Sequence, residues 1–356
     1  MLVLHGLTGS SNSPYVVGLQ KAIALEGWAS VALNWRGCSG EPNLLSRSYH
    51  SGASEDLASV IAHLRAKRPL APLYAVGYSL GGNVLLKYLG ESGENSDLQG
   101  AVAVSVPFRL DECADRIGMG FSRVYQRHFM REMVTYVKDK QRHFKDEGIS
   151  EGLAELSALG SLENMRTFWD FDGRVTAPLH GFADAKDYYR RASSRYYLGD
   201  IRTPTLIIQA ADDPFVFKHS LPEPEELSAS TEFELQEKGG HVGFVDGSLK
   251  NPGYYLERRI PLWLTSAHGT GLQLITLNTS PVGAAEVCEA FILIHRYRSL
   301  RQLLQVKYSP RYSPVPWTPS QLIFTGEDYV QAPVATSRPG SVIHSLHDPA
   351  YNAPSG

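Results

Sequence analysis

The chain has 356 residues, 43% of them hydrophobic and 20% charged, which is ordinary globular composition. Its net charge of −3 lacks the basic excess of nucleic-acid-binding proteins, and no run of 18 apolar residues predicts a membrane span. The first residues do not form a signal peptide, and three cysteines without a Cys-x-x-Cys pair favour a reducing compartment and argue against structural zinc. We therefore expect a cytoplasmic protein with no nucleic-acid partner and no integral membrane segment.

Short apolar runs and helical patterns alternate through the first third of the chain. The predicted strands are residues 2–4, 29–33, 73–76 and 101–106, and the predicted helices are residues 14–26, 54–65 and 83–89. Ser54 is expected to be the N-cap of the second helix, because serine accepts hydrogen bonds from free backbone N–H groups. Such an alternation predicts βαβ units and therefore an α/β fold with a mostly parallel sheet.

From residue 108 to about 198 the pattern becomes helical, with many aromatic residues and arginines. Strand patterns return at 204–209 and 232–236, and a last helix is expected at 254–264. These changes predict a core in two parts, residues 1–107 and 199–266, interrupted by a helical cap at 108–198. An insertion after a core strand lies above the carboxyl edge of the sheet, so the cap should cover the functional site.

The last part of the chain differs in composition from the rest. Residues 283–306 have the pattern of a helix, and residues 309–356 are rich in Pro, Ser and Tyr with little periodicity. We expect residues 267–356 to be a tail that is partly disordered.

The stretch Ala75–Asn83 is an apolar strand that runs through Gly77-Tyr78-Ser79-Leu80-Gly81 into a helix. A Gly-x-Ser-x-Gly turn between a strand and a helix is typical of a nucleophile elbow, in which the serine hydroxyl projects above the sheet. The neighbours two residues away must be small, and glycine has no Cβ to clash. Ser79 is therefore the candidate nucleophile.

The acid and the base that a nucleophilic serine needs follow at later strand ends. Asp212 and Asp213 end the strand at 204–209, and His241 follows the strand at 232–236. Nucleophile, acid and base in this chain order are what acyl transfer from a strand–turn–helix serine uses. The spacing from the acid to Val216 favours Asp213 over Asp212, which is expected to bond nearby backbone.

Two backbone N–H groups are predicted to form the oxyanion hole. One belongs to Leu80, and the other belongs to Leu7, which follows His5-Gly6. His5 itself is expected to hold that loop. The remaining histidines have no metal-ligand spacing, and solvated or packing roles are expected for His50, His63, His128, His143, His180 and His219. Asp170 and Asp172 are an alternative acid pair, which is disfavoured because no predicted strand end lies beneath them.

Residues 2–264 resemble the YheT-like branch of the α/β-hydrolases, bacterial esterases of AB-hydrolase subfamily four. The stretches that carry the resemblance are residues 5–10, 12–15, 36–43, 49–52, 77–83, 120–126, 180–184, 212–215 and 240–244. The resemblance implies an α/β-hydrolase fold, a catalytic triad of Ser79, Asp213 and His241, carboxylesterase activity on short or medium acyl esters, and no metal or organic cofactor.

Two features depart from that family. Its members carry a leader with the first strands of the sheet, whereas this chain begins within the third, so the strand at 29–33 is expected at an unprotected edge. The tail after about residue 266 matches nothing in the family.

The hypothesis from sequence is a serine carboxylesterase that hydrolyses a small-molecule acyl ester substrate through an acyl-enzyme on Ser79. An acyltransferase or thioesterase on the same triad is an alternative within the same chemistry. A binding protein that keeps the fold but is catalytically impaired is the alternative from another class. The binding protein is distinguished from the enzymes by whether His241 lies within hydrogen-bond reach of both Ser79 and Asp213. Hydrolysis and acyl transfer are distinguished by comparing the products formed with water and with an alcohol.

Overall fold

The computed structural model describes residues 1–248 and 251–269. Its main sheet has six parallel strands in the order β2-β1-β3-β4-β5-β6. The strands are β1 (Leu2–Leu4), β2 (Val31–Leu33), β3 (Tyr74–Tyr78), β4 (Gly100–Val104), β5 (Thr205–Ala210) and β6 (Thr231–Gln236). The expected α/β class with a parallel sheet is confirmed.

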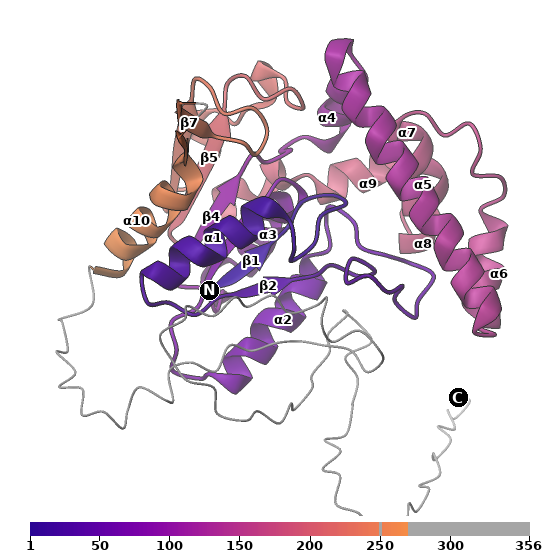
Figure 1. Cartoon of the computed structure of the whole chain (residues 1–356), viewed down its shortest axis with the longest axis horizontal. Helices are drawn as coiled ribbons and strands as arrows, with labels where there is room; N and C mark the ends of the chain where they lie inside the picture. Colours follow the sequence, from indigo (N-terminus) through magenta and orange to yellow (C-terminus); the bar gives the residue numbers. More distant parts are fainter. Residues whose placement is uncertain (249–250, 270–356) are drawn as a thin grey trace, which may run out of the picture.

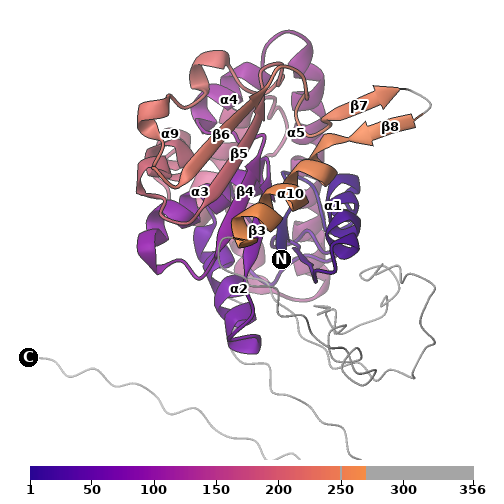
Figure 2. The ribbon, with the colours of Figure 1, turned by 90° about the vertical axis from the view of Figure 1, so that its left-hand side faces the viewer.

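Helices cover both faces of this sheet (Figure 1). They are α1 (Pro14–Leu25), α2 (Ser54–Lys67), α3 (Leu80–Ser92) and α10 (Tyr255–Gly269). Successive strand residues point to opposite faces. Val3, Val76 and Val102 therefore join the core beneath α1 and α10, whose position across one face is visible in Figure 2. Leu4, Ala75 and Ala103 join the core with α2 and α3 on the other face.

All the regular structure between β4 and β5 is helical. It comprises α4 (Leu110–Ile117), η2 (Gly120–Ser122), α5 (Arg123–Asp146), α6 (Ser150–Ala158), α7 (Phe168–Phe171), the π-helix η3 (Asp172–Thr176), α8 (Ala177–His180), α9 (Ala185–Ala192) and η4 (Ser194–Asp200). We call residues 110–200 the helical segment. It lies at one side of the sheet (Figure 1) and has a core of its own around Met130, Phe144 and Leu156. The boundaries of a cap remain a prediction.

Short turns complete the described chain. They are η1 (Gly93–Asn95), η5 (Lys218–Ser220) and η6 (Pro224–Glu226). A hairpin of β7 (Val245–Ser248) and β8 (Asn251–Tyr254), which sequence did not predict, pairs antiparallel and extends away from the main sheet (Figure 2). None of the helices in the described part is long and apolar enough to cross a membrane.

Several expectations differ from the structure in detail. Ser54 is not an N-cap: α2 begins at Ser54 itself, and the Ser54 hydroxyl donates to Glu91 at 2.6 Å, so a distant carboxylate takes the group that was expected to cap. The strand expected at 29–33 is shortened to Val31–Leu33, and it is one of the two outer strands of the described sheet. The helix expected at 83–89 begins directly after Ser79. The expected helix at 283–306, the disordered part at 309–356 and most of the predicted tail lie outside the described residues.

Candidate active site

Ser79 lies on the turn between β3 and α3, with φ 53° and ψ −117°. A positive φ is uncommon for any residue except glycine and marks local backbone strain. Its backbone N–H donates to the carbonyl of Val104 at 2.8 Å. A Cβ at Gly77 would lie 2.4 Å from the carbonyl oxygen of Gly81, and a Cβ at Gly81 would lie 2.7 Å from that of His5. The turn therefore requires glycine at both positions.

Asp213 lies in the turn that follows β5 and is 4% exposed. Its carboxylate accepts hydrogen bonds from the Gln209 side chain at 3.0 Å and from the backbone N–H of Phe215 at 2.9 Å. Asp212 has a different role: one of its oxygens accepts the backbone N–H groups of Gly239 and Gly240 at 2.9 and 2.8 Å. Asp212 thus anchors the loop that carries His241, and Asp213 is left to face the imidazole.

His241 connects the acid and the serine. Its Nδ1 lies 2.9 Å from Oδ2 of Asp213, and its Nε2 lies 2.8 Å from Oγ of Ser79. Because an ionised carboxylate can only accept, Nδ1 carries the proton and Nε2 is free to accept from the serine hydroxyl. The hydroxyl of Ser105 donates to the His241 carbonyl, and the Phe215 ring lies 4.3 Å from the imidazole. The three residues from separate strand ends meet with the geometry of a serine–histidine–aspartate relay.

The loop after β1 is held by His5. Its Nδ1 lies 2.7 Å from the carbonyl of Gly6, and its Nε2 accepts the backbone N–H of Trp35 at 3.3 Å. Burial lowers the pKa of His5 to about 4, so the ring is neutral near pH 7 and suited to these two bonds. A Cβ at Gly6 would lie 3.2 Å from the Cβ of Ser79, which shows how closely this loop approaches the serine.

A cavity of about 100 Å³ opens beside Ser79 and His241. Leu7 and Leu80, whose backbone N–H groups were predicted to form the oxyanion hole, both line it. Its other walls are mainly apolar and come largely from the helical segment: Pro107, Leu110, Cys113, Ala114, Ile117, Phe129, Phe168, Tyr188, Tyr189 and Phe215. The site therefore combines a polar relay with an apolar chamber, the usual arrangement for binding an organic ligand.

Asp172, which sequence offered only as part of a disfavoured acid pair, lines the cavity. It begins the π-helix η3, is 8% exposed, and accepts hydrogen bonds from Thr176 Oγ1 at 2.6 Å and Tyr189 OH at 2.7 Å. Burial raises the pKa of this carboxyl to about 6, although the two hydrogen bonds oppose the shift. Asp170, by contrast, closes a capping box at the start of α7 with Thr167. The two acids therefore do not act as a pair.

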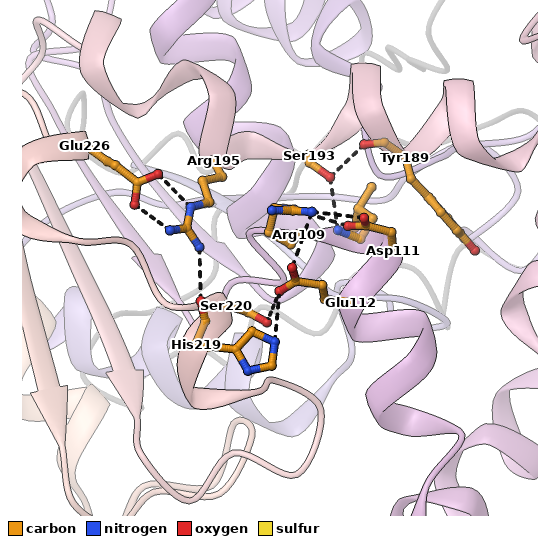
Figure 3. Close-up of polar contacts among 10 residues, drawn as sticks. Arg109, Asp111, Glu112, Tyr189, Ser193, Arg195, His219, Ser220 and Glu226 are labelled. Atoms are coloured by element: carbon orange, nitrogen blue, oxygen red, sulfur yellow. Dashed lines mark hydrogen bonds and ion pairs between the residues drawn. The ribbon is translucent and has the colours of Figure 1, made fainter.

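Polar contacts attach α4, one wall of the cavity, to its surroundings (Figure 3). Glu112 on α4 accepts a hydrogen bond from the hydroxyl of Ser220, and the hydroxyl of Ser193 accepts the Leu110 N–H at 3.0 Å. Beside them Arg195 makes a two-pronged ion pair with Glu226, at 2.8 and 2.6 Å. Such paired geometry restricts the guanidinium more than a single contact does.

Two of the remaining histidines, His180 at the end of α8 and His50 in the loop before α2, pack together. The rings of His50 and His180 lie 4.6 Å apart, and His180 lies 2.8 Å from the carbonyl of Thr176 and 2.9 Å from that of Ser48. Solvated or packing roles were expected for both residues, and the structure shows packing.

Comparisons with known proteins agree with this architecture. A profile of the alpha/beta hydrolase fold matches residues 1–248. "Putative esterase YheT" of Escherichia coli (strain K12) is 44% identical over 266 residues, which are 75% of this chain and 76% of that protein. "Phospholipase ABHD3" of Mus musculus is 30% identical over 72% of this chain, and "Monoacylglycerol lipase" of Saccharomyces cerevisiae is 30% identical over 68%. The matched parts are 61% and 54% of the length of those two relatives.

Among solved structures, Est1E from Butyrivibrio proteoclasticus aligns with 75% of this chain and 87% of its own, at 12% identity and a TM-score of 0.45. The profile match covers more than half of this chain, and the match to the Escherichia coli protein covers about three quarters of both sequences. The chain therefore belongs to the α/β-hydrolase family, in its YheT-like branch, among relatives named as esterases and lipases.

Proposed function

We propose that this chain is a serine carboxylesterase that hydrolyses short- or medium-chain acyl esters through an acyl-enzyme on Ser79. The observation that carries the proposal is the pair of contacts made by His241, 2.8 Å to Ser79 Oγ and 2.9 Å to Asp213. The names of the relatives support the same reaction class.

The relay suggests the order of proton movements. His241 takes the hydroxyl proton as Ser79 Oγ forms a bond to the ester carbonyl carbon, and Asp213 stabilises the resulting imidazolium. The oxyanion would lie toward the backbone N–H groups of Leu7 and Leu80. His241 then gives its proton to the departing alcohol. A water molecule repeats the sequence on the acyl-enzyme, releases the acid and restores Ser79.

The small volume of the chamber favours a short acyl group. It is about 100 Å³, which is less than the roughly 150 Å³ of an engineered cavity that binds benzene. Its walls are mostly apolar, with Asp172 as the buried carboxyl among them. A longer acyl chain would require the helical segment to move or the chain to leave through the mouth.

The test is covalent labelling with a fluorophosphonate, followed by turnover of p-nitrophenyl esters. Wild-type protein should label at Ser79, and Ser79→Ala should lose both labelling and at least about 10⁴-fold in kcat. The matched control is Ser59→Ala, because Ser59 is an exposed serine on α2 that bonds only within its helix in the described contacts. A folded wild-type protein that neither labels nor turns over esters would instead favour a binding protein on this fold.

A further inference from the structure

A group of exposed apolar side chains lies where α4 passes through η2 into α5. Met119, Phe121, Val124 and Tyr125 are 52%, 77%, 53% and 39% exposed. Within the described residues, no other four large exposed apolar side chains lie so close in sequence. Exposed apolar groups that gather in this way mark interaction sites, whereas single ones are normal. We call these four residues the η2 patch.

The η2 patch is continuous with the wall of the cavity. Ring contacts lead inward from Phe121 to Tyr125 at 6.2 Å, from Tyr125 to Phe215 at 5.0 Å, and from Phe215 to His241 at 4.3 Å. The hydroxyl of Ser122, within η2, donates to the carbonyl of Pro214 at 2.7 Å and fastens the patch to the acid turn. Molecules that gather on the patch would therefore be beside the candidate catalytic residues.

The charge around the η2 patch is positive, although the whole chain has a net charge of −3. Residues 119–131 contain three arginines and no acidic residue, and the last of the three, Arg131, pairs with Glu132 at 3.3 Å. The arginines, Arg123, Arg127 and Arg131, are exposed and recur every four residues, so they form one stripe along the beginning of α5. Apolar side chains beside a stripe of cations are the pattern of surfaces that lie on anionic lipid.

We propose that the η2 patch docks this protein on the surface of anionic lipid, with the apolar side chains among the acyl chains and the arginines against the phosphates. The beginning of α5 lies at an outer part of the helical segment, beside α4 (Figure 1). As a route for substrate the inference rests on the proposed esterase function, but lipid binding is measured without turnover. Docking would bring esters of low water solubility to the mouth of the cavity.

The test is sedimentation of the full chain with vesicles of phosphatidylcholine alone or mixed with phosphatidylglycerol, at low and at high salt. Wild-type protein should bind the mixed vesicles, and binding should weaken with salt. Phe121→Ser should lower the partition coefficient about tenfold on mixed vesicles. Arg123→Glu with Arg127→Glu should lower it at least as much, and the loss should be largest at low salt.

The matched control is Leu70→Ser, because Leu70 is 97% exposed but lies after α2, outside the η2 patch. It should bind vesicles as wild type does. Hydrolysis of a water-soluble ester by each variant reports folding, and it separates the two proposals: turnover without vesicle binding overturns the docking surface alone. Vesicle binding that Phe121→Ser leaves unchanged also overturns it. A dimer in light scattering that Phe121→Ser converts to monomer would make the patch a subunit interface and overturn the lipid assignment.

Discussion

The carboxyl ends of the strands and the helical segment contribute to the same site under different constraints. Ser79, at the carboxyl end of β3, lies on a strained turn that tolerates only glycine two residues away on either side. The walls from the helical segment, such as Phe129 and Tyr188, are side chains on helices with ordinary backbone. Backbone constraints fix the residue type at the carboxyl ends of the strands, whereas in the helical segment packing leaves a choice of residue. We therefore expect substitutions at the strand ends to abolish catalysis and substitutions in the helical segment to alter substrate selectivity.

After Ser79 itself, the largest effect is expected at Asp213. Asp213→Asn replaces the acceptor for His241 Nδ1–H with an amide that can donate, which favours the wrong tautomer and should lower kcat about 10⁴-fold. Asp212→Asn is the matched control, because Asp212 bonds the backbone N–H groups of Gly239 and Gly240 through one oxygen, which an amide can replace. It should lose less than about tenfold, as for other loop-anchoring contacts. Equal losses in both variants, measured with p-nitrophenyl butyrate, would contradict the assignment of Asp213.

The second effect concerns the pH dependence of stability and comes from Asp172. Burial raises the pKa of its carboxyl to about 6 in the folded protein, against about 3.9 in an unfolded chain. Between those values the folded state holds a proton that the unfolded state has lost, so this group favours folding as the pH falls from about 7 toward 4. The change amounts to about 3 kcal/mol at most.

Asp172→Asn isolates that contribution, since asparagine does not titrate but keeps the shape and one acceptor for Tyr189 or Thr176. The free energies of unfolding of wild type and variant should be measured by urea denaturation across this pH range. The wild type should gain stability relative to the variant as the pH falls. A difference that stays constant with pH would show that Asp172 is not a buried titrating group.

The features that sequence could predict lie at the strand ends, and those that it could not predict lie mainly in the helical segment. The Gly-x-Ser-x-Gly turn and the acid and histidine after later strands were readable, because parallel strands end at one edge and tight turns demand particular residues. The positions of Asp172 and Cys113 in the cavity wall were not readable, because they depend on how helices pack, and no local periodicity encodes that. The hairpin β7–β8 was missed for a related reason: β7 is exposed throughout, so it lacks the alternation of a half-buried strand.

The smallest effect is expected at Phe129, which is half-buried on α5 and whose ring lies 6.1 Å from that of Phe168 and 6.0 Å from that of Phe215. Phe129→Ala should enlarge the cavity, and the ratio of kcat/KM for p-nitrophenyl octanoate to that for the butyrate should rise about tenfold. Phe144→Leu controls for loosening of the helical segment, since Phe144 is fully buried in the core of that segment. It should lower stability while leaving the ratio unchanged. A ratio that moves equally in both variants would mean that the flexibility of the helical segment, rather than the wall at Phe129, sets the acyl length.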